Sequence, residues 1–475
     1  MVVKTPHKYI EPGFRQNMEE RQIENLNIKG EIPEWLEGSL VRNGPGMKHV
    51  DKPMRHWFDG LAMLHKFSFA KGKVSYLSKF VDCAAFRETT EKGKISYSDF
   101  ATDPCRSLFQ KVQTVFENPP KITDSAKVSI DTIGDKWFAW GEPLLQVQFD
   151  PETLEKVGVF HYEVPPQTAM NTAHPHQDAD AAYNLVLKYG PINHYKIYSM
   201  ADEVKELASI PVLEPGYMHS FGMSKRYFII AEFPLVVQSI KLLLRQRPFI
   251  ENFKWKKHRG TRFLIIDRET GKLKTTIKTD AFFSFHHVNA FEKDGQLMVD
   301  LAAYEDASIV DHYYINRMAS PDQELPFGRM ERYTLDVENS RLVEHKVLSE
   351  ACIELPSFDY SNYNMNPDYR YVYGCGIHPE RRNEFYNQLV KIDLQTGKHL
   401  TWYQPDFYPG EAVFVPHPDR KAEDDGVLLS VVLDAEQNNS FLLLLDAKNL
   451  QEIGRAALPH AMLIGYHGKF IQPNN

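Results

Sequence analysis

The chain has 475 residues, of which 43% are hydrophobic, so it is long enough to bury a large core. Its 63 acidic residues against 55 basic ones give a formal net charge of −8, which disfavours nucleic acid as a partner because phosphate binding needs a basic face. The four cysteines form no CxxC pair, and this fits a reducing compartment rather than a disulfide framework; they are Cys83, Cys105, Cys352 and Cys375.

The N-terminal segment MVVKTPHKYIEPGF lacks the apolar stretch of a secretory signal. No run in the sequence approaches the roughly 18 apolar residues that a spanning helix needs. We therefore expect a soluble, cytoplasmic protein.

Hairpin signals recur along the whole chain. Each consists of an apolar strand with alternating pattern, a turn containing Asp, Gly or Asn, and a second strand. In five of them an Asp ends the first strand; these are Asp150, Asp267, Asp336, Asp393 and Asp446. Two further segments, 65–80 and 184–200, have the strand pattern without the Asp.

The spacing of these hairpins predicts a repeat architecture. The last three intervals between the aspartates are 69, 57 and 53 residues, close to one propeller blade of about 40–50 residues with insertions. The first interval is 117 residues and leaves room for two blades. Five marked and two unmarked hairpins predict an all-β, seven-bladed propeller that forms one domain over 1–475. Such hairpins also occur in β-sandwiches, so another all-β fold stays an alternative.

Helix signals are few, and two segments combine apolar with basic residues. SLFQKVQTVF places an apolar stripe at helical spacing; it contains Leu108, Phe109, Val112 and Phe116. The segment 240–260 contains Leu243, Leu244 and Trp255, and seven basic residues against one acidic residue, Glu251. These two segments predict a patch that docks on an anionic membrane surface. The alternative is an ordinary buried helix with a solvated basic edge.

Nineteen histidines are present, and no HExxH, GxGxxG, P-loop or GxSxG motif accompanies them. Several lie in apolar or Gly/Pro-rich segments on separate strands: TAHPHQD, GYMHSFG, FSFHHVNAFE and GYHGKF. The inner strands of a propeller face one axis, so these histidines could meet there. His286 and His287 are adjacent on a strand and point to opposite faces, so at most one looks inward. The residues alone lead only to a possible multi-histidine site.

Seven sequence elements, in order, make the chain resemble the carotenoid cleavage oxygenase family, which includes carotenoid dioxygenases and the vertebrate retinoid isomerase. They are RNGPG (42–46), WFDGLAMLH (57–65), TAHPHQD (172–178), YMHSFG (217–222), FHHVNAFE (285–292), LPSFDYSNYN (355–364) and GYHGKF (465–470). TDPCR (102–106) resembles an element of the animal branch.

The resemblance implies a specific metal site on a capped face of the propeller. Its iron ligands fall on His174, His219, His286 and His467. Three glutamates that hydrogen-bond to ligand histidines fall on Glu142, Glu354 and Glu411, where a carboxylate would fix the imidazole tautomer. By the same alignment His65 is structural, and His176 and His287 are neighbours of ligands.

The resemblance also implies an activity. Four neutral imidazoles suit Fe²⁺ and leave two positions for O₂ and substrate. The expected reaction is oxidative cleavage of one conjugated C=C bond in a carotenoid or apocarotenoid, giving two aldehydes or other carbonyl products. The main alternative is the retinoid isomerase (isomerohydrolase) reaction at the same iron; a stilbene-type substrate and a non-catalytic scaffold without metal are others. The enzyme is expected to associate peripherally with a membrane to collect its substrate.

Overall fold

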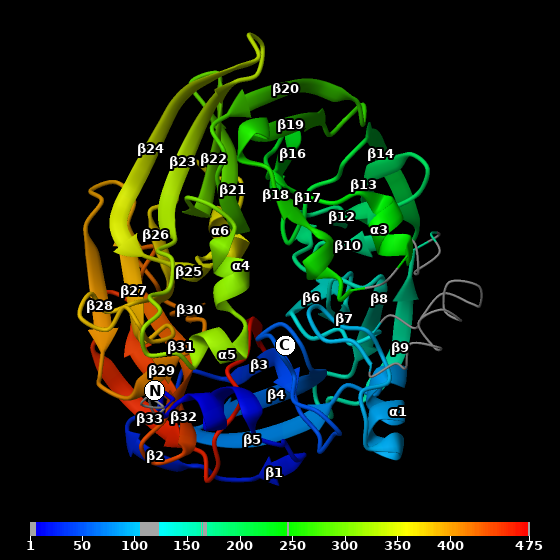
Figure 1. The fold of residues 1–475 in the computed structure, drawn as a ribbon. Coiled ribbons are helices and arrows are strands. Elements are labelled where there is room, and N and C mark those ends of the chain that lie inside the picture. Colours follow the sequence, from blue (N-terminus) through cyan, green and yellow to red (C-terminus); the bar gives the residue numbers. More distant parts are fainter. Residues whose placement is uncertain (1–5, 105–122, 163, 165–168, 245–246, 474–475) are drawn as a thin grey trace.

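Antiparallel sheets follow one another along the chain and are arranged in a ring in the computed structural model (Figure 1). The structure describes residues 6–104, 123–162, 164, 169–244 and 247–473. Within these residues, seven sheets have four or more strands, which confirms the predicted seven-bladed, all-β propeller. An eighth sheet has only two strands, β17 (Leu235–Val236) and β18 (Lys254–Trp255).

Three consecutive blades make up the first part of the ring. One contains β6 (Ser129–Ile133), β7 (Lys136–Trp140), β8 (Leu145–Phe149) and β9 (Lys156–His161). The next contains β10 (Ala169–Asn171), β11 (His176–Gln177), β12 (Ala182–Lys188), β13 (Asn193–Met200) and β14 (Val204–Val212). The third contains β15 (Gly222–Met223), β16 (Tyr227–Glu232), β19 (Thr261–Asp267) and β20 (Leu273–Thr279).

Two more blades follow in the same up-and-down order. One contains β21 (Phe283–Lys293), β22 (Gln296–Tyr304), β23 (Arg329–Asp336) and β24 (Arg341–Cys352). The other contains β25 (Glu354–Ser357), β26 (Tyr371–Gly376), β27 (Gln388–Asp393) and β28 (His399–Tyr403).

The last two blades close the ring by exchanging strands from the two ends of the chain. One combines β29 (Phe407–Pro409), β30 (Val413–Pro416), β31 (Gly426–Asp434), β32 (Asn439–Asp446) and β33 (Glu452–Ala457) with the early strand β2 (Asn27–Gly30). The other combines β1 (Arg21–Ile23), β3 (Gly38–Gly46), β4 (Leu61–Ala70) and β5 (Lys73–Phe80) with the late strand β34 (Gly468–Ile471). Neither blade is complete without the far end of the chain.

The seven predicted hairpins lie in seven different blades, which rules out the sandwich alternative. The marking aspartates bend the turns as expected: Asp150 Oδ1 accepts hydrogen bonds from the backbone N–H of Glu152 (2.7 Å) and Thr153 (3.0 Å). Asp446 Oδ1 accepts from the N–H of Lys448 (2.8 Å) in the same way. These are Asx-type turns, in which the side chain satisfies the turn backbone.

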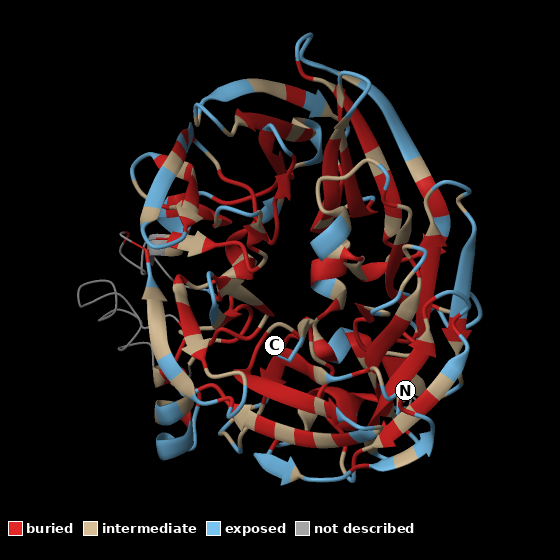
Figure 2. Cartoon of the chain, turned by 180° about the vertical axis from the view of Figure 1, so that it is seen from behind, coloured by how far each residue is buried: buried red, intermediate tan, exposed pale blue. Residues whose placement is uncertain are grey.

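Burial increases toward the axis of the ring. The inner strand β21 is buried along most of its length, whereas the outer strand β24 is exposed over its first half. Figure 2 shows the same gradient, with exposed residues along the outer edges of the blades. Polar side chains on inner strands therefore lie in a largely water-excluded environment.

Short helices and turns complete the structure. They are α1 (Ala84–Lys92), α3 (Ser239–Leu244), α4 (Ser308–His312), α5 (Ile315–Met318) and α6 (Tyr360–Tyr363), a π-helical turn at Glu11–Arg15, and 3-10 turns at Ile250–Asn252 and Lys257–Arg259. Of the predicted apolar stripe, Leu108, Phe109, Val112 and Phe116 lie outside the described residues. In the part of the chain that is described, every helix is too short or too polar to cross a membrane.

Candidate metal centre

Four histidines from four different blades converge at the axis of the ring. His174 lies between β10 and β11, His219 precedes β15, His286 is in β21, and His467 directly precedes β34. The Nε2 atoms of His174 and His219 are 3.2 Å apart, and those of His286 and His467 are 3.1 Å apart. One ring nitrogen from each of the four lies within 4.8 Å of all the others.

This arrangement fits a single metal ion. Two imidazole nitrogens that bind one first-row ion at about 2.1 Å lie about 3 Å apart when their bonds are at right angles. Two of the pairs already have this separation. All four candidate donors are imidazole nitrogens. Neutral nitrogen donors of this kind suit Fe²⁺.

Three carboxylates orient three of the rings. His219 Nδ1 donates to Glu142 Oε1 (2.9 Å), and His467 Nδ1 donates to Glu411 Oε1 (2.8 Å). His286 Nδ1 bonds Glu354 Oε1 in the same way. Because the proton is held on Nδ1, the lone pair of each Nε2 points into the ring of histidines.

Further hydrogen bonds hold the carboxylates, and sequence reasoning did not identify these partners. Glu142 accepts from the hydroxyl of Tyr217, and Glu354 accepts from the hydroxyl of Tyr304. The only available signal was the position of Tyr217, two residues before His219 and so on the same side of an extended segment. Behind Tyr304, the hydroxyls of Tyr386 and Tyr313 continue the chain of hydrogen bonds (3.0 and 2.6 Å).

Glu411 has a different partner from the other two carboxylates. Its Oε2 accepts from Arg42 Nη1 (2.8 Å) and from the backbone N–H of Gly468 (2.8 Å). Both members of this ion pair are buried, with side-chain exposures of 4% and 7%. Arg42 belongs to the RNGPG element and also donates to the carbonyl of Tyr466 (2.8 Å), so this element supports the segment that carries His467.

The electrostatics favour neutral imidazoles and ionised carboxylates. Burial and the neighbouring histidines hold the pKa of His174 well below its usual value, and burial lowers the pKa of His467 to about 4 although Glu411 opposes the shift. Burial by itself raises the pKa of Glu354 and of Glu411. In both, the facing histidine and the hydrogen bonds outweigh burial, and the pKa is lowered. All these groups are therefore in the protonation state that metal binding requires.

The remaining histidines of the motifs are engaged elsewhere. His176 bonds the carbonyl of Phe221 through Nε2 (2.8 Å) and the hydroxyl of Tyr360 through Nδ1 (2.9 Å). His287 bonds Ser220 Oγ (2.9 Å), and His65 bonds the hydroxyl of Tyr76 (2.8 Å). The structure thus separates the four converging histidines from their neighbours.

Comparison with known proteins identifies the family. The model of the family described as retinal pigment epithelial membrane protein matches residues 14–472. A carotenoid-cleaving dioxygenase, mitochondrial, from Macaca fascicularis is 33% identical, with 94% of this chain and 92% of that protein covered. The chain belongs to the carotenoid oxygenase family.

Other proteins of the carotenoid oxygenase family, among them apocarotenoid oxygenase (ACO), match this chain over nearly its whole length. A beta,beta-carotene 15,15'-dioxygenase from Gallus gallus is 32% identical, with 98% of this chain and 99% of that protein covered. The solved structure of cobalt-substituted Synechocystis ACO has a TM-score of 0.86 at 26% identity, with 98% of each chain covered. An ACO/RPE65 chimera has a TM-score of 0.87 at 26% identity, with 99% of this chain and all of that chain covered.

An apolar cavity reaches the histidines from one side. Its walls include His219, His286 and His467 together with aromatic rings; among these are Trp57, Phe58, Phe100, Phe249, Phe285, Tyr313 and Tyr466. The ring of Phe58 stacks on that of His219, with centroids 5.9 Å apart. Such a lining suits a long apolar molecule.

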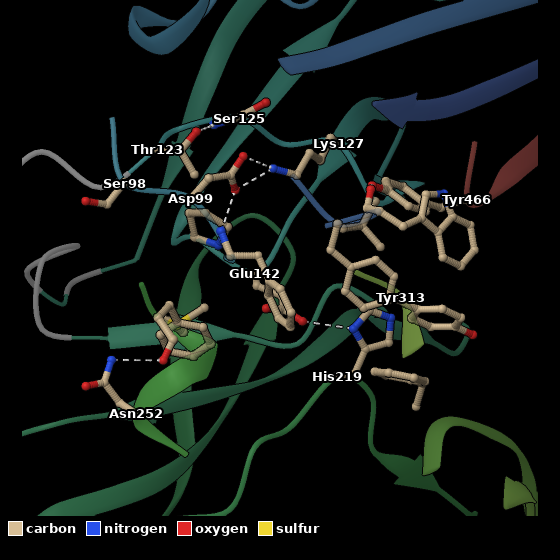
Figure 3. A pocket seen from close by; sticks show the side chains of 18 of the residues that line it. Ser98, Asp99, Thr123, Ser125, Lys127, Glu142, His219, Asn252, Tyr313 and Tyr466 are labelled. Carbon is tan, nitrogen blue, oxygen red and sulfur yellow. Dashed lines mark hydrogen bonds and ion pairs between the residues drawn. The ribbon is translucent and has the colours of Figure 1, made fainter. Parts of the chain in front are cut away.

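One wall of the apolar cavity is polar. Asp99 and Lys127 form a buried ion pair there (2.6 Å), and Lys127 also donates to the carbonyl of Gly60 (3.0 Å). Figure 3 shows this pair on one wall and His219, bonded to Glu142, on another. The pair satisfies its own hydrogen bonds, so it shapes the wall without an unpaired charge.

The structure describes only part of the predicted membrane patch. Leu243 and Leu244 lie in α3, but their side chains are outside what the structure describes. Trp255 is half-buried and packs against the main hydrophobic core; that it faces lipid stays a prediction. The basic charge of this segment is also reduced, because Lys256 and Arg259 pair with Glu214, each at 2.8 Å.

Proposed function

We propose that this chain is a non-haem Fe(II) dioxygenase that cleaves one conjugated C=C bond of a carotenoid or apocarotenoid. The C=C bond breaks and each of its carbons receives one oxygen atom of O₂, which gives two carbonyl products. One observation carries this proposal: four histidines bring one ring nitrogen each to within 4.8 Å of all the others, and an aromatic cavity reaches three of them. The names of the curated relatives support the substrate class.

The ligands in this proposal are His174, His219, His286 and His467. Glu142, Glu354 and Glu411 hold three of them in the tautomer that binds a metal. Bound iron would supply the redox centre at which O₂ becomes reactive toward an alkene. The chain itself contributes orientation and the exclusion of water rather than acid–base chemistry.

The apolar cavity is proposed to select the bond that is cleaved. A polyene is a thin apolar rod, and a cavity lined by aromatic side chains such as Phe58, Phe285 and Tyr313 can fix its depth along the histidines. The tyrosine hydroxyls near the site stay protonated, because burial raises the pKa of Tyr313 and Tyr217 well above its usual value. They position groups and do not serve as bases.

Incubation of the iron-loaded protein with an apocarotenal under ¹⁸O₂ tests the proposal. A shorter aldehyde and a second carbonyl fragment, each carrying label, support a dioxygenase. The retinoid isomerase reaction is the second candidate, because the matching family model is described by a retinal pigment epithelial protein. Conversion of a retinyl ester into an isomerised alcohol, without cleavage of the apocarotenal, would replace the first proposal by the second.

We further propose that the protein is cytoplasmic and collects its substrate at a membrane surface. Leu242 of α3 and Phe249 line the apolar cavity, and Ile240 of the same helix is 59% exposed. A cavity wall beside an exposed apolar residue suits transfer from lipid. Flotation with liposomes is expected to increase with anionic lipid and decrease with salt, and Leu243→Ser with Leu244→Ser is expected to weaken it. Equal flotation of that variant would contradict the docking surface.

A further inference from the structure

A second cavity reaches the histidines from the other side. It is lined by His174, His286 and His467, whereas the apolar cavity is lined by His219, His286 and His467. The second cavity also has the larger volume, at about 430 Å³ against about 140 Å³. The histidine ring thus separates two spaces of different character.

The second cavity follows the axis of the propeller. All seven blades contribute lining residues, mostly from their innermost strands; examples are Ile130, His176, Phe221, Val288, Ser357, Val415 and Phe470. At its outer rim are Ser361, Asn362 and Gln472, which are exposed. This axial cavity therefore leads from the surface to three of the four histidines.

Its walls carry charges and hydroxyls. Asp131 and Lys469 lie on the inner strands β6 and β34 and form an ion pair. Asp359 lines the cavity too and pairs with Arg420. Ser220 and Tyr360 add hydroxyl groups. Oxygen atoms of this kind can replace water molecules around a hard divalent cation.

The two cavities differ in how they would receive a hydrated cation. Moving a divalent ion into the mostly aromatic cavity removes much of its water with little to replace it, because Asp99 on the polar wall is already paired with Lys127, and this is unfavourable. A larger cavity with carboxylates and hydroxyls lets the ion keep most of its water or exchange it for protein oxygen. His174 is the ligand that lines only the axial cavity, and within the described contacts it has no carboxylate partner.

We propose that the axial cavity is the passage by which a hydrated divalent metal ion reaches the four histidines. The apolar cavity remains the passage for the organic substrate. This inference rests on the proposed metal site and adds the route of loading to it. The Asp131–Lys469 pair supplies part of the charge along that route, so a change at either residue alters the local charge and with it how fast a cation arrives.

The test measures the rate of Co²⁺ uptake by the metal-free protein, followed by the visible absorption that Co²⁺ acquires on histidine ligation. Asp131→Asn leaves Lys469 unpaired in the passage and is expected to slow uptake about fourfold, the effect of one unit charge on a divalent ion roughly 10 Å away. Lys469→Met leaves Asp131 unpaired and is expected to accelerate uptake by a similar factor. Both effects shrink as salt is added.

Two controls address the apolar side. Asp99→Asn removes the matched carboxylate of the Asp99–Lys127 pair in the apolar cavity and is expected to leave the uptake rate unchanged. If that variant does not fold, the wild-type protein serves instead: an apocarotenal added without O₂ fills the apolar cavity and should not slow Co²⁺ uptake.

The outcomes separate the passage from the site. Equal rates for Asp131→Asn and Lys469→Met, shifts in the same direction, or slower uptake with the apocarotenal would overturn the axial route. In those cases the amount of Co²⁺ bound at saturation stays at about one ion per chain, so the metal site survives. If no variant and no wild-type protein binds Co²⁺ at saturation, the site and the passage are both wrong.

Discussion

The four histidines divide into two groups that the protein prepares differently. His219, His286 and His467 each donate Nδ1–H to a buried carboxylate, so their rings are oriented before any ion arrives. His174 has no such partner in the described contacts, and its neighbour Ala173 is held instead, with its N–H on the carbonyl of His219 (3.1 Å). The comparison indicates three candidate ligands that are preorganised and a fourth, His174, that would adapt.

The largest expected effect comes from removing a preorganised ligand. His286→Ala should abolish activity and lower the bound iron sharply while the circular dichroism spectrum stays that of a folded propeller. His287→Ala is the matched control, because its ring bonds Ser220 and its nitrogens are not among those of the four converging histidines; it should keep most of its iron. Metal analysis of both variants decides this. Loss of iron only in His287→Ala would show that His287, and not His286, is the metal ligand.

The carboxylates should have the next largest effect. Glu142→Gln and Glu354→Gln are each expected to cost roughly 10–100-fold in metal affinity or activity, because an amide holds the imidazole tautomer less firmly. Competition with a chelator measures the affinity. No change in either variant, beside a large loss in His174→Ala, would mean that preorganisation of the rings is unimportant.

Glu411→Gln should differ from the other two carboxylate variants. It leaves Arg42 as a buried charge without its partner, and breaking a buried ion pair in this way costs roughly 3–5 kcal/mol. We therefore expect a reduced free energy of unfolding in addition to weaker metal binding. Urea unfolding of the metal-free variants checks it, with Glu142→Gln as the reference. Equal midpoints would indicate that Arg42 finds another acceptor.

A smaller effect on metal affinity is expected from the tyrosine hydroxyls that hold the carboxylates in place. Tyr304→Phe removes a hydroxyl that donates to ionised Glu354, and a hydrogen bond to a charged group contributes roughly 1.5–3 kcal/mol. Only part of this reaches the metal, so the expected loss of affinity is a few-fold. Tyr386→Phe, one hydroxyl further along, should have less effect still. A larger effect at Tyr386 than at Tyr304 would contradict this order.

The last expected effect is on the pH dependence of stability, and it concerns two histidines that support the fold and bind no metal. Burial lowers the pKa of His56 and of His65 to about 3, against about 6.5 when unfolded. Between pH 6.5 and 3 the unfolded chain binds more protons than the folded one, so stability falls as the pH is lowered. Each histidine contributes up to about 1.4 kcal/mol per pH unit. Urea midpoints at pH 7 and pH 5 measure the sum, and equal midpoints at the two pH values would contradict it.

Local patterns in the sequence predicted the blades well. The aspartates of the hairpins act through contacts two or three residues away, so their signal is contained in a short window. The pairing of β2 with β33 and of β3 with β34 left no such signal, because it joins segments more than 400 residues apart. Ring closure had to be seen in the structure.

The candidate metal site could be predicted from the sequence only in part. Alternation along a strand could not decide between His286 and His287, and β21 has register shifts on either side of this pair, between Ser284 and His286 and between His287 and Asn289. Such bulges re-aim side chains, so the simple two-residue period fails there. The membrane role of Trp255 stays a prediction for a different reason: an apolar residue is suited both to lipid and to the core, and Trp255 is only half-buried where it contacts the core.

The strand that closes the ring also carries part of the site. β34 pairs with β3 over only four residues, from Ser39 with Ile471 to Arg42 with Gly468, and His467 directly precedes it. An ion bound by both His467 and His286 would link the closing strand to a blade on another part of the ring. Amide hydrogen exchange at residues 468–471 should then report metal occupancy. Exchange is expected to be fast in the metal-free protein and slow when the ion is bound.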